Sequence, residues 1–136
     1  MIQNLGLVNS LVRTDERNVS VAGVVARLDG AVQNCYNAGT VSGLTTVGGV
    51  VGSNNIGAIE NCYNTGTVSS VYANAGGVVG DNNSGAIENC YNTGTVSSDS
   101  GNAGGVVGNN NNGTTIKNCY NTGAVSSVYA NAGGVV

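Results

Sequence analysis

Cysteine is the residue type in this 136-residue chain with the widest chemical reach, because a thiolate can act as a nucleophile, a metal ligand or one half of a disulfide. The chain has four, separated by 27, 28 and 29 residues: Cys35, Cys62, Cys90 and Cys119. A zinc site needs ligands that converge on one point, and the sequence contains neither a histidine nor a Cys-x-x-Cys pair. The regular interval is the informative feature instead, and it is typical of a repeat protein.

Each cysteine occupies the same place in a repeated block. The blocks read AVQNCYNAGTVS, AIENCYNTGTVSS twice, and TIKNCYNTGAVSS, and the last three follow GGVVG and an Asn-rich stretch. The chain has no Phe and no Trp, which are the side chains that usually fill a globular core. Order must therefore come from the stacking of repeats on one another.

The elements that position these residues are short strands. Within a repeat, the β-branched runs are bounded by Gly and Asn clusters, and no segment has the apolar spacing of a helix. About 28 residues hold three short strands and their corners, with each strand pairing with its equivalent one coil away at ~4.8 Å. The sequence predicts an all-β chain: a parallel β-helix of about five coils, right-handed because parallel crossovers prefer that hand.

The first residues form a divergent coil. Residues 2–6 (IQNLG) align with residues 59–63 (IENCY), which predicts an opening or capping coil over residues 1–22. The solenoid repeats then cover residues 23–136, approximately as 23–47, 48–75, 76–103 and 104–132, with a partial repeat at 133–136. Six of the 11 charged residues fall in the first 30, which suits a polar cap or, as the alternative, a binding loop.

Stacking identical coils predicts columns of identical side chains along the axis. The aliphatic position before the variable Gln33, Glu60, Glu88 and Lys117 is expected in the core; it holds Val32, Ile59, Ile87 and Ile116. Two amide ladders are expected, one of Asn34, Asn61, Asn89 and Asn118, the other of Asn37, Asn64, Asn92 and Asn121. The thiols Cys35, Cys62, Cys90 and Cys119 are expected to be buried and unbridged, because side chains stacked in register point the same way.

The tyrosine that follows each cysteine is the candidate binding residue. If the cysteines face inward, the next residue along the strand faces outward. These outward residues are the tyrosines Tyr36, Tyr63, Tyr91 and Tyr120. Such an aromatic strip can bind a glycan or a protein, because tyrosine offers large contact area at low entropic cost. The alternative is that the stacked rings only shield the sheet.

Other chemistry is disfavoured by the composition. There is no histidine to serve as a general base and a single lysine, Lys117, so we expect no catalytic residues, no metal site and no cofactor. GGVVG lacks the Gly-Lys-Ser/Thr of a phosphate loop. With four basic residues and a net charge of −3, nucleic acid is not an expected partner. No apolar run of 18 residues and no leader pattern appear, so membrane insertion is not expected and any export signal would lie outside this sequence.

The recurring block GGVVGxNxxGAIENCYNTGTVSS resembles the GLUG repeat family, whose pattern is approximately GGLVGxNxGxIxNSYxTGxVSG. The resemblance extends from Ile2 to Val136, and the chain differs by Cys where Ser is common and by Val for Leu in GGVVG. It implies a bacterial extracellular or surface-attached protein, such as an adhesin or a repeat region accompanying an immunoglobulin A peptidase, in which the repeats serve as stalk or binding surface. No catalytic residues carry over, because the repeat has none.

The leading hypothesis is therefore a non-catalytic structural and adhesive module with a host glycan or protein as ligand. The alternative is a filament subunit that associates end to end, since the sequence stops directly after GGVV and an open solenoid end is a template for another strand. A minor alternative is ice binding, suggested by Thr-Gly-Thr at residues 65–67 and 93–95. That pattern lapses at Ala38 and Ala124.

Overall fold

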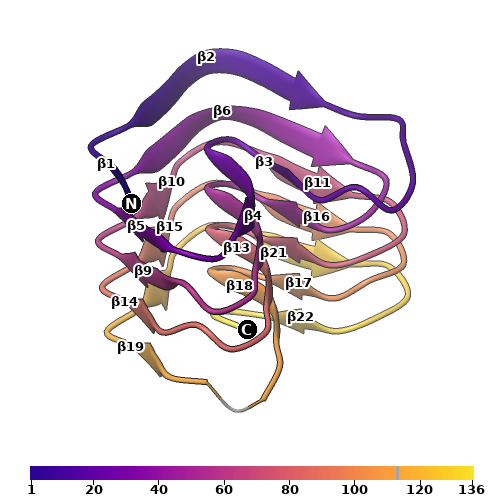
Figure 1. Cartoon of the computed structure of the whole chain (residues 1–136). Helices are drawn as coiled ribbons and strands as arrows, with labels where there is room; N and C mark the ends of the chain where they lie inside the picture. Colours follow the sequence, from indigo (N-terminus) through magenta and orange to yellow (C-terminus); the bar gives the residue numbers. More distant parts are fainter. Residues whose placement is uncertain (113) are drawn as a thin grey trace.

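Short runs of Val, Ala and Ile between Gly and Asn clusters cannot form stable hairpins alone, so each pairs with its counterpart in the next repeat. The computed structural model describes residues 1–112 and 114–136 as five coils stacked along one axis, with every strand pair parallel (Figure 1). The indigo N-terminal coil and the yellow C-terminal coil lie at opposite ends of the stack. The prediction of an all-β parallel solenoid with about 28 residues per coil is confirmed.

Four sheets run along the stack, named here A to D in the order in which each coil visits them. Sheet A contains β1 (Ile2–Gln3), β5 (Ala31–Gln33), β9 (Ala58–Glu60), β14 (Ile87–Glu88) and β19 (Ile116–Lys117). Sheet B contains β2 (Gly6–Arg13), β6 (Tyr36–Gly43), β10 (Tyr63–Asn64), β11 (Val68–Ser70), β15 (Tyr91–Asn92), β16 (Val96–Ser98), β20 (Tyr120–Asn121) and β21 (Val125–Ser127). Sheet C contains β3 (Val21–Ala22), β7 (Val47–Gly48), β12 (Ala75–Gly76), β17 (Ala103–Gly104) and β22 (Ala132–Gly133). Sheet D contains β4 (Val25–Leu28), β8 (Val51–Asn54), β13 (Val79–Asn82) and β18 (Val107–Asn110).

The predicted number of strands per coil was wrong. The third coil contains five short strands, β9 to β13, rather than three. One reason is that the paired glycines in GGVVG form a corner, so this segment is divided between sheets C and D. The other reason lies in sheet B. The second coil contributes one continuous strand, β6, whereas each later coil contributes two short strands separated at Thr-Gly-Thr or its equivalent.

The register places identical residues on identical residues. Tyr63 pairs with Tyr91 and Asn64 with Asn92, and Ile87 lies between Ile59 and Ile116. The opening coil keeps this register in sheet A, where Ile2 pairs with Val32, but in sheet B the pairing of β2 with β6 shifts between Val8 and Leu11. The alignment of residues 2–6 with the later repeats is therefore reproduced by the strand pairing.

Two apolar clusters fill the interior. One joins sheets A and D and includes Val32, Ile59 and Ile87, all fully buried, together with the cysteines; Ile116 in the last coil is half-buried. The other joins sheets B and C around Val41, Val68 and Val96. The aliphatic column was thus predicted correctly. Burial of this surface is the main favourable term that replaces a globular core.

Glycine sets the distance between coils at the corner from sheet C to sheet D. A Cβ atom added at Gly77 would lie 2.0 Å from the carbonyl oxygen of Gly105, and one added at Gly49 would lie 2.0 Å from that of Gly77. Only a residue without a side chain permits this approach. In residues 1–112 and 114–136 no helix is both long and apolar enough to cross a membrane.

Candidate functional site

The outer face of sheet B is the most regular surface of the molecule. Strand alternation turns every second residue outward, while the residues between them, such as Asn64 and Val68, are fully buried. The outward positions form four columns along the axis, named here by their commonest residue. The tyrosine column is Tyr36, Tyr63, Tyr91 and Tyr120; the two threonine columns are Ala38, Thr65, Thr93 and Thr122, then Thr40, Thr67, Thr95 and Ala124; the serine column is Ser42, Ser69, Ser97 and Ser126.

The tyrosine column is a continuous ladder of parallel rings. Successive ring centroids are 4.9, 4.9 and 5.1 Å apart and the planes differ by 4° or less, so the rings follow the coil spacing. Tyr120 is 52% exposed, whereas the other three rings are half-buried, and burial raises the pKa of Tyr91. The predicted outward orientation is confirmed, and the exposed surface of the strip consists largely of ring edges and hydroxyl groups, because most ring faces are stacked.

The asparagine before each cysteine forms the corner that presents the tyrosine. Asn34, Asn61, Asn89 and Asn118 all have φ between 53° and 54°, a left-handed conformation that asparagine tolerates better than other non-glycine residues. Their side chains are exposed, and hydrogen bonds join only some of them: Asn34 to Asn4 at 3.3 Å and Asn118 to Asn89 at 3.2 Å. The column exists as predicted, but these asparagines act mainly by adopting the left-handed backbone conformation that the corner requires.

The asparagine after each tyrosine forms a complete internal ladder. The Nδ2 of Asn37 donates to the Oδ1 of Asn64, which is repeated from Asn64 to Asn92 and from Asn92 to Asn121, each time at 2.7 Å. Every Nδ2 also donates to the carbonyl oxygen two residues ahead in its own coil. This second predicted ladder is confirmed, and it holds sheet B at a fixed spacing directly behind the outer face.

A third asparagine ladder was missed. Asn54 donates to Asn82 at 2.9 Å and Asn82 to Asn110 at 2.8 Å, at the end of sheet D. Asn54 and Asn82 are fully buried, and each also bonds to the glycine three residues ahead. From the sequence alone, the Asn clusters are interpreted only as boundaries of the strands. Its constant feature, Asn at the fourth position of Val-Gly-x-Asn in the three later repeats, was the signal that could have revealed the ladder.

The cysteine file lies on the inner side of the same corner. All four thiols are free; Cys35, Cys62 and Cys90 are fully buried and Cys119 is half-buried. Each Sγ contacts the carbonyl oxygen two residues earlier, at 3.2 Å from Cys62 to Glu60. The neighbouring thiols of Cys119 and Cys62, together with burial, raise the pKa of Cys90, and the proximity of Cys90 lowers the pKa of Cys119 to about 7. Among the described residues no three such side chains are grouped to hold a metal ion.

A groove runs beside the serine column, at the corner between sheets B and C. It has a volume of about 290 Å³ and is lined by Arg13, Thr14, Asp15, Ser42, Gly43, Leu44, Ser69, Ser70, Val71, Ser97 and Asp99. Arg13 pairs with Ser42 at the end of the serine column, so the groove extends from the first coil to the fourth. The sequence left undecided whether the charged opening segment is a cap or a binding loop. In the structure, its residues Arg13, Thr14 and Asp15 line this groove.

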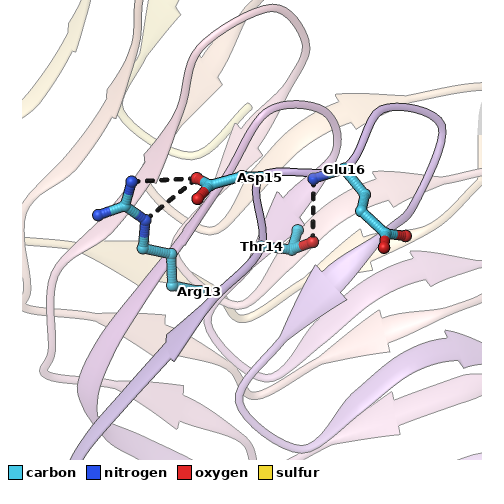
Figure 2. A network of polar contacts seen from close by, with 4 residues as sticks. All are labelled: Arg13, Thr14, Asp15 and Glu16. Atoms are coloured by element: carbon cyan, nitrogen blue, oxygen red, sulfur yellow. Dashed lines mark hydrogen bonds and ion pairs between the residues drawn. The ribbon is translucent and has the colours of Figure 1, made fainter.

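Arg13 and Asp15 form the polar end of the groove. Arg13 Nε and Nη2 donate to one carboxylate oxygen, Asp15 Oδ1, at 3.2 and 3.0 Å. Figure 2 shows the two nitrogens directed at this oxygen. The Thr14 hydroxyl accepts a hydrogen bond from the backbone N–H of Glu16, whose carboxylate points away from the pair (Figure 2). Arg17 lies 4.8 Å from the ring centroid of Tyr72, which anchors the segment to the third coil.

The two carboxylates of the groove are not both free for hydrolysis of a glycoside. Asp15 and Asp99 both line the groove, Asp15 from the opening coil and Asp99 from the fourth. Glycosidases work with two carboxyl groups placed about 5 to 10 Å apart across one glycosidic bond. Here the Asp15 carboxylate is held in an ion pair with Arg13.

Comparison with known proteins identifies the repeat. Residues 43–69, 72–97 and 99–126 each match the family described as the GLUG motif. A search of curated proteins found no match. Among solved structures, the crystal structure of a "putative immunoglobulin A1 protease" from Bacteroides ovatus is similar, with a TM-score of 0.78 and 23% sequence identity. The alignment covers 98% of this chain and 59% of the other, so it shows a shared fold over part of a longer protein.

Proposed function

This chain belongs to the GLUG-motif family, and from that premise we propose that it is a non-catalytic structural and adhesive module of a bacterial extracellular or cell-surface protein. The observation that carries the proposal is the tyrosine ladder on the outer face of sheet B. It places four aromatic side chains in one file on a surface that is backed by the buried Asn37–Asn121 ladder.

Rigidity supports the structural part of the proposal. The two buried asparagine ladders and the backbone bonds between coils fix the spacing along the whole stack. No buried side-chain N or O atom of the described residues lacks a hydrogen-bond partner. A module of this kind transmits its orientation from one end to the other, which is the property that a stalk needs.

Adhesion is supported by the chemistry of the outer face. Its tyrosine hydroxyls and ring edges lie next to rows of threonine and serine hydroxyls, so the surface offers many weak donors and acceptors around an aromatic strip. Such a surface suits a glycan or a protein loop, because rings already held by stacking lose little entropy on binding.

The absence of catalysis is part of the proposal. The chain has no histidine, and its single lysine, Lys117, is exposed on sheet A, away from the groove. The similar solved protein is named a protease, but this chain spans 59% of it at 23% identity, so that name carries no activity to these repeats. An extracellular location is supported by the family membership alone.

Binding to an array of glycans and immobilised extracellular matrix proteins tests the proposal. The wild-type chain is compared with the double variant Tyr63→Ser/Tyr91→Ser and with Tyr129→Ser, whose ring is 82% exposed and lies outside the ladder. We expect the double variant to lose at least about tenfold in affinity and Tyr129→Ser to bind as the wild type does. Circular dichroism establishes that each variant is folded. No ligand for the wild type, or equal loss in Tyr129→Ser, would contradict the proposal.

A further inference from the structure

The groove beside the serine column has a defined donor and acceptor pattern that the tyrosine ladder does not explain. We propose that this groove binds a short neutral oligosaccharide, with Arg13 and Asp15 holding one sugar and the hydroxyls of Ser42, Ser69 and Ser97 contacting the next ones along the axis. The inference rests on the proposed adhesive function and assigns it a second site, at the opposite edge of the outer face from the tyrosines.

The ion pair presents a donor beside an acceptor. Both bonds from Arg13 go to Asp15 Oδ1, which leaves Arg13 Nη1 and Asp15 Oδ2 without a partner among the described residues. A hydroxyl group donates one hydrogen bond and accepts others, so two neighbouring sugar hydroxyls can accept from Nη1 and donate to Oδ2 together. The Arg13 and Asp15 side chains are 63% and 74% exposed, so a ligand can reach both.

The serine column continues the polar surface away from the ion pair. Ser42, Ser69 and Ser97 are half-buried on three successive coils, and none of their hydroxyls has a hydrogen-bond partner within the described part of the chain. Their neighbours differ, because the hydroxyls of Ser70 and Ser98 bond to carbonyl oxygens of the adjacent coil. In the pairs Ser69–Ser70 and Ser97–Ser98 the second serine is therefore structural and the first is available to a ligand, as is Ser42, which precedes a glycine.

The spacing favours a sugar chain over a peptide. The serine hydroxyls repeat with the coil, at ~4.8 Å, and all point to the same side. An extended peptide advances about 3.3 Å per residue and turns its polar groups to alternate sides, so it cannot match this row. Leu44 and Val71 line the same groove and give apolar contact for the C–H face of a pyranose.

Charge and size narrow the ligand class further. The groove contains one guanidinium, already paired, and two carboxylates, Asp15 and Asp99, so an acidic sugar would meet a net negative charge. Its volume of about 290 Å³ lies at the lower end of ligand sites, which suits a chain of few sugars. A neutral oligosaccharide fits both properties.

Titration calorimetry with three trisaccharide probes tests the inference. The probes are a neutral one, N,N′,N″-triacetylchitotriose, its free-amine counterpart chitosan triose, and the acidic trigalacturonic acid. Groove variants are Asp15→Asn, Arg13→Ala and Ser69→Ala/Ser97→Ala. Two matched controls are Glu16→Gln, next to the pair but outside the groove, and Ser126→Ala, in the same column but beyond it.

We expect the neutral probe to bind better than the acidic one and each groove variant to weaken its binding about tenfold, with both controls unchanged. Preference for the acidic probe, or equal loss in the controls, would overturn the inference. Sugar binding that is lost in Tyr63→Ser/Tyr91→Ser but kept in every groove variant would also overturn it, while leaving the adhesive function standing. If none of these probes nor any glycan on the array binds, while a protein or peptide does, the oligosaccharide site is excluded although adhesion remains.

Discussion

Asn64 illustrates how single residues determine this fold. Its side chain donates to Asn92 Oδ1 at 2.7 Å and to the carbonyl oxygen of Gly66 at 2.8 Å, and accepts from Asn37 at 2.7 Å. A fully buried amide is costly unless every polar atom is bonded, and here stacking supplies the partners. The ladder is therefore stabilising only in register, which favours one alignment of nearly identical coils over its alternatives.

Replacing Asn64 by Ala tests this role. The change removes three hydrogen bonds and leaves the Gly66 carbonyl and the amide of Asn37 short of a partner in the interior, so we expect a loss of about 2 to 4 kcal/mol in the free energy of unfolding. Asn121→Ala is the matched control, because Asn121 is half-buried and has a ladder neighbour on one side. Urea denaturation followed by circular dichroism gives both values. Equal losses would show that the ladder is not the stabilising element.

For single residues, the sequence predicted the structure correctly where the same residue type recurs at the same strand position in each repeat. The Asn37 ladder follows from the repeat alone, because an invariant residue on a strand must stack on itself. The Asn54 ladder was missed because composition does not distinguish a buried amide from the solvated ones beside it, and only its constant place in Val-Gly-x-Asn sets it apart. The groove could not be predicted from the sequence either, because it depends on how the segment after Arg13 folds back over the serine column.

At the level of secondary-structure elements, the corner between sheets C and D restricts which residues a repeat can carry. β12 ends at Gly76 and β13 begins at Val79, so Gly77 and Val78 make the whole turn. Val78 is fully buried, while Gly77 lies against the backbone of the next coil. The sequence indicated that Gly clusters bound the strands, but not that the GGVVG segment would be divided between two sheets, because a turn this short has no polar residues to mark it.

Gly77→Ala should therefore be strongly destabilising. Its Cβ would lie 2.0 Å from the carbonyl oxygen of Gly105 and 2.5 Å from the side chain of Asn92, and the backbone can yield only by separating two coils. We expect a loss of about 3 kcal/mol or more. Gly30→Ala is the control, because nothing lies within 4 Å of its added Cβ, and it should change stability by less than about 1 kcal/mol. Thermal unfolding of the two variants in parallel decides the point, and similar melting temperatures would contradict the prediction.

The whole molecule has two unlike ends. In the first coil three columns stop: Leu5 occupies the cysteine position, Gly6 pairs with Tyr36, and Leu7 pairs with Asn37. The last coil keeps the column residues Cys119, Tyr120 and Asn121. The amide ladder is also directional, because each Nδ2 donates toward the following coil. The final amide, that of Asn121, therefore has a donor pointing out of the stack.

This asymmetry bears on filament formation. A head-to-tail filament needs one end to complement the other. If the first coil of a second copy followed the last coil of the first, Leu7 would face the amide of Asn121, and the donor would be buried without an acceptor, at a cost of about 1 to 3 kcal/mol. The irregular pairing of β2 would further disturb the contact, since its register shifts between Val8 and Leu11.

We therefore expect no end-to-end filaments of the wild-type chain. Sedimentation velocity and negative-stain electron microscopy across a wide concentration series should show small particles of constant mass. The Leu7→Asn variant supplies the missing acceptor, and if the ladder governs the contact, this variant should associate at lower concentration than the wild type. Long fibres of the wild-type chain would contradict the prediction, because they would mean that the ends recognise each other through surfaces other than the stacked columns. Association that is unaltered by Leu7→Asn would exclude the asparagine ladder as the determinant.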